Sequence, residues 1–344
     1  MRVLDPRFAL TGAYLFACAA SGGGEGTPNA ERNQPGLGPV PMNPGDDELV
    51  TEIEAERAPA PVLEAGRYVF RLGEIELVVD PAIGGRITRF SLGGENILTG
   101  PEVVAGGEGA TPNMYGSTFW TSPQSGWGWP PEAAIDSAPH AASLDGTALA
   151  LASEAGAATG YAVHKRFEAD ATRAAIHIEY TLENQSATQA AAPWEISRVP
   201  KAGFVVFPAT GPALSQSSLP GTFSAGLAWV DLSLAPPADS KLFQDGSEGW
   251  LAYVLGEVAF IKVFDDLEPA AAAPGEAEIE VFTNGLYDYA EIEQQGPYVL
   301  PPAGSRSSWR VSWVLERVPA GVDPVLGSSQ LVEWLRGRVA RVRG

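Results

Sequence analysis

Cysteine is almost absent from this sequence, because Cys18 is the only one in 344 residues. A single cysteine excludes an intrachain disulfide and a metal site built from several thiolates. Histidine is nearly as scarce, and no two of His140, His164 and His177 have the spacing of a metal-ligand pair. Phosphate-loop, dinucleotide-binding and nucleophile-elbow motifs are missing too. We therefore expect no metal and no other cofactor.

Positive charge is the second shortage. The chain has 22 basic and 42 acidic residues, which gives a formal charge of −20. A chain with this excess of negative charge repels the phosphates of nucleic acid at long range. We expect no nucleic-acid partner and attribute the acidity to solubility. Lysine is especially rare and occurs only at Lys165, Lys201, Lys241 and Lys262.

The apolar run near the N-terminus is short. Residues 8–17 follow two arginines and are too few to span a bilayer, but they have the length of a signal-peptide core. The run ends in Leu15-Phe16-Ala17-Cys18, which resembles a bacterial lipobox. The pattern predicts a lipoprotein signal peptide over residues 1–17, lipidation at Cys18 and a lipid-anchored protein at the outer membrane or periplasmic face of a bacterial cell envelope. The alternative is an ordinary secretory signal and a secreted protein.

Residues 18–62 are predicted to form a flexible linker. They are dominated by Gly, Pro, Ala, Asn and acidic residues and lack apolar periodicity. A short helix over residues 47–57 is the one regular element that their pattern allows.

Residues 63–318 have a β pattern throughout. Short β-prone runs alternate with turn residues such as Gly84-Gly85, and almost no helical stretch interrupts them. This pattern predicts an all-β fold, a large antiparallel sandwich or barrel in one unit of ~250 residues. The predicted strands are 68–72, 75–79, 86–92, 161–167, 175–182, 204–207, 226–232, 250–255, 258–264, 278–284, 287–295 and 309–315.

The last segment, residues 319–344, is predicted to carry a short C-terminal helix. Over 328–343, apolar residues recur on one stripe at Leu331, Trp334, Leu335 and Val339, and arginines follow near the end, as suits a helix C-terminus.

Three tryptophans stand close together in residues 113–129. Trp120, Trp127 and Trp129 lie in a segment so rich in Gly, Ser and Pro that it predicts an irregular loop. Such indoles either plug the end of a core or line a site for a ligand with flat apolar faces and many hydroxyls, as a sugar has. The segment alone leaves both alternatives open.

Polar side chains line one side of the predicted strand 287–295. Alternation puts Tyr289, Glu291 and Glu293 on the same face, together with Tyr287 and Gln295. Alternation alone favours a solvated face. If the row instead lines a groove, its carboxylates can act as general base beside hydroxyl-binding groups.

The segment 192–199 also alternates. Trp194 and Arg198 share one face, and Glu195 and Ser197 share the other. Arg198 is suited to stack on an aromatic ring or to bind the carboxylate of an acidic sugar, and equally to pair with a neighbouring Glu.

Taken together, these segments resemble a galactose mutarotase-like (aldose 1-epimerase-like) domain, in a bacterial branch of unknown function. The resemblance rests on residues 79–87, 120–130, 193–198 and 291–297. It implies a large twisted β-sandwich whose concave face binds carbohydrate, as a monosaccharide or a glycan. Substrate-binding side chains are then expected at Arg86, Trp120, Gln124, Trp127, Trp129, Trp194, Arg198 and Tyr289.

The resemblance also implies a chemistry. In mutarotases a late-strand Glu takes the proton of the anomeric hydroxyl, and a central His protonates the ring oxygen. The Glu corresponds to Glu291 or Glu293, but the segment that carries the His has none here. Glu195 can replace it only with a strongly raised pKa. We therefore predict a carbohydrate-binding envelope lipoprotein. The alternatives are a carbohydrate-active enzyme (epimerase, lyase or hydrolase) that uses Glu291 or Glu293, and a structural envelope protein with buried tryptophans.

Overall fold

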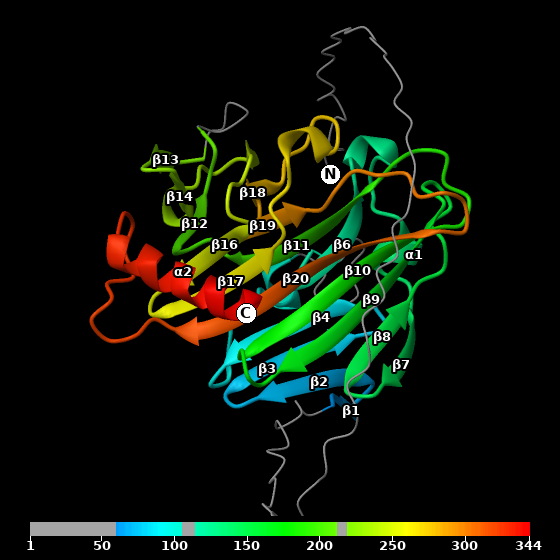
Figure 1. Cartoon of the computed structure of the whole chain (residues 1–344), viewed down its shortest axis with the longest axis horizontal. Coiled ribbons are helices and arrows are strands. Elements are labelled where there is room, and N and C mark those ends of the chain that lie inside the picture. Colours follow the sequence, from blue (N-terminus) through cyan, green and yellow to red (C-terminus); the bar gives the residue numbers. More distant parts are fainter. Residues whose placement is uncertain (1–59, 105–113, 212–218) are drawn as a thin grey trace, which may run out of the picture. The chain divides into compact units, whose positions relative to one another are not determined.

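The computed structural model describes residues 60–104, 114–211 and 219–344 (Figure 1). The predicted signal peptide, Cys18 and nearly all of the predicted linker, with its short helix, lie outside these residues. The domain boundaries at 62 and 318 stay predictions. In the described part of the chain, no helix is long and apolar enough to cross a membrane.

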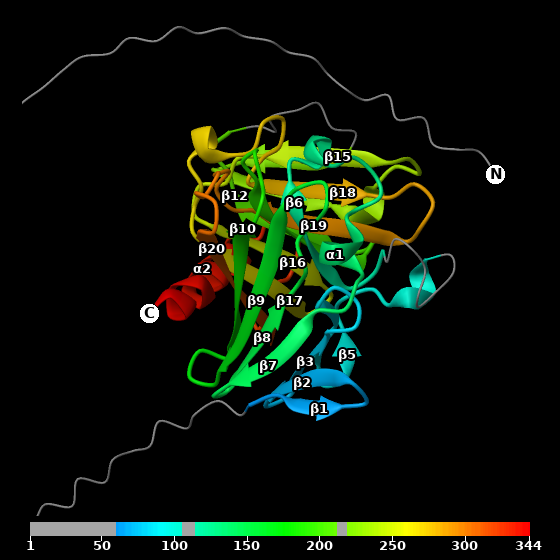
Figure 2. The same cartoon turned by 90° about the vertical axis from the view of Figure 1, so that its right-hand side faces the viewer.

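Two antiparallel sheets of ten strands each form the fold (Figures 1 and 2). Sheet A has the order β1 (Val62–Glu64), β2 (Arg67–Leu72), β3 (Ile75–Asp80), β4 (Arg86–Leu92), β6 (Ser117–Ser122), β11 (Ala192–Pro200), β19 (Tyr289–Gln295), β18 (Ile279–Thr283) and β15 (Ser240–Gln244), with β5 (Glu95–Asn96) beside β4. Sheet B has the order β13 (Gly221–Ser224), β14 (Leu227–Asp231), β12 (Phe204–Pro208), β16 (Trp250–Leu255), β17 (Val258–Phe264), β20 (Arg306–Arg317), β10 (Ala175–Asn184), β9 (Tyr161–Asp170), β8 (Ala148–Ala152) and β7 (Ala141–Asp145).

The inner faces of the two sheets share one apolar core. Phe90 of sheet A packs against Phe260 and Trp313 of sheet B, with ring centroids 5.3 Å away in each case. Phe119 of β6 stacks on Tyr180 of β10 at 4.6 Å. Sheet A therefore turns alternate side chains toward sheet B, and the others toward its outer face.

The predicted β-sandwich is confirmed, and so is the C-terminal helix. Every predicted β run overlaps a strand, and 86–92, 250–255 and 258–264 match to the residue. The helix α2 (Ser329–Arg343) begins after Ser328, whose side chain accepts a hydrogen bond from the Leu331 backbone N–H. Its buried residues Leu331, Leu335 and Val339 pack on the outer face of sheet B, in a second apolar cluster with residues of β16 and β17 (Figure 1).

The prediction of an irregular loop over 113–129 is wrong at residues 117–122. These form β6, an inner strand of sheet A that pairs with β11 and places Trp120 opposite Trp194. Glycine and proline stand on both sides of the strand, at Gly116 and Pro123, and dominate the composition of the segment. Between them, Ser-Thr-Phe-Trp-Thr-Ser is β-prone and long enough for a strand. The segment continues through the 3₁₀ turn η2 (Gln124–Gly126) to the short helix α1 (Ala133–Asp136).

Candidate functional site

The outer face of sheet A carries most of the predicted site residues. The register puts Trp120 of β6 opposite Trp194 of β11, and Arg198 of β11 opposite Glu291 of β19. Glu293 lies two residues along β19 from Glu291, so its side chain is on the same face. The structure thus brings the tryptophan segment and the carboxylate row together on one surface.

Trp120 is the centre of an aromatic cluster. Its ring meets those of Trp127, Trp129 and Trp194 edge to face, at centroid distances of 5.7, 6.1 and 5.5 Å. Trp120 and Trp194 are buried, whereas Trp127 is half-buried and Trp129 is 55% exposed. The packing alternative therefore holds for the inner two tryptophans, whereas Trp129 presents its indole to solvent.

Arg198 and Glu291 form a buried ion pair. The guanidinium Nη2 lies 2.8 Å from a Glu291 carboxylate oxygen, and the cation sits 5.5 Å above the ring of Trp120 and 5.9 Å from that of Tyr289. Burial, with the nearby Glu293, raises the pKa of Glu291, although Arg198 opposes the shift. Of the uses expected for Arg198, the structure shows two, namely the pairing with a Glu and the placement of the guanidinium over an aromatic ring.

Glu293 is held by a hydrogen bond and an ion pair. Trp194 Nε1 donates to Glu293 Oε2 at 2.8 Å, and Lys241 Nζ lies 3.1 Å from the same oxygen. Lys241 also pairs with Glu280 at 2.5 Å. Although burial opposes it, the two carboxylates hold the pKa of Lys241 well above its ordinary value. The ammonium therefore remains charged and neutralises part of the acidic row.

The preference for a solvated face over strand 287–295 is wrong for its carboxylates. Glu293 is 0% exposed and Glu291 6%. The physical reason is the position of β19, which lies between β11 and β18, so large side chains flank its residues on both sides. Alternation along one strand reports which residues share a face, but it does not report what covers that face.

Arg86, Gln124 and Tyr289 have other surroundings. Arg86 is fully buried, with Nη2 2.8 Å from Asp136 Oδ1 in α1, an oxygen that also accepts from Trp120 Nε1. Asp136 thus connects the helix α1 both to Arg86 of β4 and to Trp120 of β6. Gln124 is half-buried in η2, where its backbone N–H donates to Glu276 at 3.3 Å. Tyr289 is fully buried on the outer face of sheet A, beside Arg198.

The structure does not bring Glu195 together with the other carboxylates. Its side chain points between the sheets, where Lys262 Nζ lies 2.9 Å away and Trp313 Nε1 donates at 3.0 Å. Tyr180 Oη donates to the same carboxylate at 2.5 Å. Glu195 is therefore a component of the interior and has no contact with the outer face of sheet A.

Two residues of this surface escaped the sequence analysis, namely Lys241 and Glu280. They stand on β15 and β18, far in sequence from the segments that drew attention. The one signal was the rarity of lysine, since a chain with so few is expected to use some of them at specific positions. Only the sheet order places Lys241 beside Glu293.

None of the three histidines lies on the outer face of sheet A. His140 is buried near Gly85, with Nε2 3.2 Å from the Ala134 carbonyl. His164 and His177 belong to sheet B, where they face Glu183 at 2.8 Å and Asp170 at 3.3 Å. The general acid of a mutarotase therefore has no histidine counterpart on this face. The described residues also contain no group of His, Cys, Asp and Glu side chains that could hold a metal ion.

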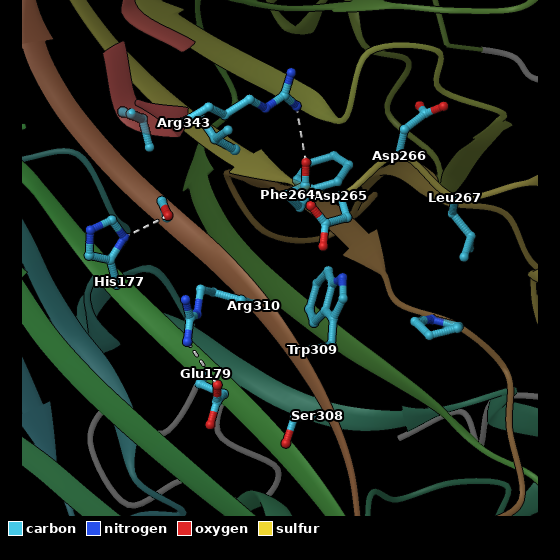
Figure 3. Close-up of a pocket in the computed structure, with 14 residues that line it drawn as sticks. His177, Glu179, Phe264, Asp265, Asp266, Leu267, Ser308, Trp309, Arg310 and Arg343 are labelled. Atoms are coloured by element: carbon cyan, nitrogen blue, oxygen red, sulfur yellow. Dashed lines mark hydrogen bonds and ion pairs between the residues drawn. The ribbon is translucent and has the colours of Figure 1, made fainter. Parts of the chain in front are cut away.

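A hollow of about 570 Å³ lies on the outer face of sheet B (Figure 3). Several of its polar side chains are already partnered. His177 Nδ1 lies 2.8 Å from the Ser312 hydroxyl, Arg310 pairs with Glu179 at 3.0 Å, and an Arg343 N–H donates to a backbone carbonyl. These contacts are typical of a solvated sheet surface with satisfied charges, and leave few groups free to bind a ligand.

Comparison with known proteins identifies the fold. No family model and no curated protein matches the sequence. Among solved structures, an Escherichia coli K12 protein described as a candidate aldose 1-epimerase is 14% identical, with 73% of this chain and 99% of that one matched at a TM-score of 0.50. A galactose mutarotase-like protein from Lactobacillus casei is 8% identical, with 73% and 100% matched at a TM-score of 0.50. At these identities the likeness shows the fold alone, which is galactose mutarotase-like.

Proposed function

We propose that this protein binds carbohydrate on the outer face of sheet A without the anomer exchange of a mutarotase. The observation that carries the proposal is that the exposed indole of Trp129 lies on the same face as the buried ion pairs of Glu291 and Glu293. Trp129 rests against Trp120, and Trp120 joins Trp194 and the Arg198–Glu291 pair. The mutarotase-like fold supports the same assignment by analogy.

Trp129 is the proposed stacking platform. Its exposed ring is held edge to face by Trp120, and so it is a pre-oriented apolar surface that suits the C–H face of a sugar ring. Lys241, 23% exposed at its side chain, is a cationic donor on the same face for a hydroxyl oxygen. An indole with polar groups nearby is the composition that carbohydrate recognition requires.

Binding is favoured over turnover because the carboxylates are occupied. A general base must reach the proton that it removes. Glu291 is bound to Arg198, and Glu293 to Trp194 and Lys241, and both carboxylates are buried. The missing histidine removes the acid partner as well.

An epimerase-like enzyme is the second candidate. The raised pKa of Glu291 favours it, because a carboxyl with a pKa closer to neutrality is a better proton carrier. In that case Glu291 would act as the base once a sugar had displaced Arg198 from it.

We also propose that the protein is lipid-anchored through Cys18 in a bacterial cell envelope. The support is the lipobox-like Leu15–Cys18 after a short apolar run. Intact-mass measurement of membrane-extracted protein tests this proposal. We expect an N-terminus at Cys18 with added acyl mass, and an unmodified full-length chain would refute it.

The sugar site is tested by saturation-transfer NMR of the purified protein with a panel of aldoses and uronic acids. We expect saturation transfer to at least one sugar, with no anomer exchange above the buffer rate. Trp129→Ala should weaken binding about 2- to 10-fold, the worth of one aromatic contact. The matched control is Phe223→Ala, which removes an exposed ring on sheet B and should leave binding unchanged.

Two results would overturn this assignment. Anomer exchange that disappears in Glu291→Gln or Glu293→Gln would make the protein an enzyme. Sugar binding that is equally strong in the Trp129→Ala variant would place the sugar elsewhere.

A further inference from the structure

A cleft of about 330 Å³ opens beside the tryptophan cluster, at the end of β6. Its walls come from the turn after β6, the start of β9, the loop before β11 and Tyr298. Trp127 is one wall of this cleft, and it also packs on Trp120 at 5.7 Å. The cleft is therefore continuous with the cluster that holds Trp129. Its volume is at the lower end of the range for ligand pockets, ~300–1,000 Å³.

The lining is free of charge. None of the 15 lining residues is acidic or basic, in a chain of which 19% is charged. The polar groups are instead hydroxyls and one amide, from residues such as Thr121, Thr159, Thr188 and Gln189. The aromatic groups are Trp127, Tyr161 and Tyr298. Hydroxyl and amide groups beside aromatic rings match the hydroxyls and C–H faces of an uncharged sugar.

Ser122 is an independent sign of a ligand. This residue lines the cleft and is 1% exposed, and its Oγ has no hydrogen-bond partner among the described residues. A buried hydroxyl left without a partner costs about 1–3 kcal/mol, so native structures normally supply one. A ligand hydroxyl in the cleft would supply it.

We propose that this cleft is a second subsite that takes a neutral sugar unit, so that the ligand is an oligosaccharide rather than a monosaccharide. The inference rests on the proposed function, because the first unit is the one stacked on Trp129. One sugar unit occupies the Trp129 side of the cluster, and a following unit enters the cleft past Trp127, against Tyr298 and the Ser122 hydroxyl.

An array of immobilised neutral and acidic glycans, followed by calorimetry with the best binder and its monosaccharide, tests the inference. We expect the oligosaccharide to bind at least about tenfold more tightly than the monosaccharide, and neutral chains to bind better than uronic-acid chains. Tenfold corresponds to 1.4 kcal/mol.

The decisive variant is Thr188→Arg, which puts a long charged side chain at the exposed rim of the cleft. It should abolish the gain with chain length and keep the monosaccharide affinity. The matched control is Gln185→Arg, an exposed residue of the same loop that does not line the cleft. Tyr298→Ala should reduce the same gain.

The outcomes separate the two proposals. One outcome is monosaccharide binding that depends on Trp129 together with no gain in affinity for longer chains, or with a gain that survives in Thr188→Arg. This outcome would overturn the subsite and leave the proposed function standing, and the cleft would then hold water only. Absence of binding to any glycan would overturn both.

Discussion

Several ion pairs in this protein are buried, and the pairing determines what single substitutions in them do. Arg198 lies with Glu291, Lys262 with Glu195, and both members of each pair are buried. Removing one member leaves an uncompensated charge in a low-dielectric interior, whereas removing both removes the desolvation cost as well. A substitution at one of these four residues is therefore expected to change the free energy of unfolding, whether or not the residue takes part in binding.

Lys262→Met is expected to lower the free energy of unfolding by about 3–5 kcal/mol, because it leaves the Glu195 carboxylate unpaired between the sheets. The double variant Lys262→Met, Glu195→Gln should recover a large part of that loss. Urea denaturation followed by tryptophan fluorescence measures both. A double variant less stable than the single one would contradict the explanation.

Lys165 should make stability depend on pH. Burial, with Arg86 nearby, lowers the pKa of Lys165 to about 7, while an unfolded lysine titrates near ~10.4. Between these two pKa values the unfolded chain binds one proton more than the folded chain. The contribution of Lys165 to the free energy of unfolding therefore rises as the pH increases from about 7 to about 10. Lys165→Met should remove this rise in urea denaturation at stepped pH. An unchanged slope would show that Lys165 does not titrate in this way.

At the scale of elements, β6 decides the geometry of the site. It carries Trp120 into the centre of sheet A and is preceded by Gly116, which has φ +62°. A Cβ at Gly116 would lie 2.3 Å from the Ile87 carbonyl oxygen, so only glycine fits this approach of two backbones. The turn at Gly116 thus sets where the strand begins, and with it the position of the tryptophans.

Gly116→Ala is expected to destabilise the protein more than Gly128→Ala. Both positions have positive φ, which costs an alanine roughly 1–2 kcal/mol, but a Cβ at Gly128 meets no atom of the described residues within 4 Å. The difference in free energy of unfolding between the two variants measures the clash with Ile87. Equal losses of unfolding free energy in the two variants would mean that the backbone before β6 can shift away from Ile87 with little loss of stability.

On the scale of the whole molecule, the sequence predicted the sandwich more fully than the site. Alternation showed that Trp194 and Arg198 share one face, and this holds, because it depends only on one strand. Which strands are neighbours depends on sheet order, which no local pattern encodes. The partnership of Lys241 with Glu293 and the inward position of Glu195 could therefore not be derived from the sequence.

One core shared by both sheets predicts a single unfolding transition. Phe90 and Phe119 of sheet A pack directly on rings of sheet B, so neither sheet keeps its inner face covered when the other unfolds. Urea midpoints from tryptophan fluorescence and from far-UV circular dichroism should coincide. Two separated midpoints would indicate that the sheets unfold independently.

The place of β20 governs when the chain can fold during its synthesis. This strand is the last of the chain, yet it lies between β10 and β17 in sheet B. As the chain leaves the ribosome, β10 and β17 emerge before residues 306–317, so the two halves of sheet B have nothing to join them. The core contact of sheet A with sheet B also needs β20, since Phe90 packs on Trp313 of that strand. The native pairing of sheet B and the Phe90–Trp313 contact can therefore form only after nearly the whole chain has been synthesised.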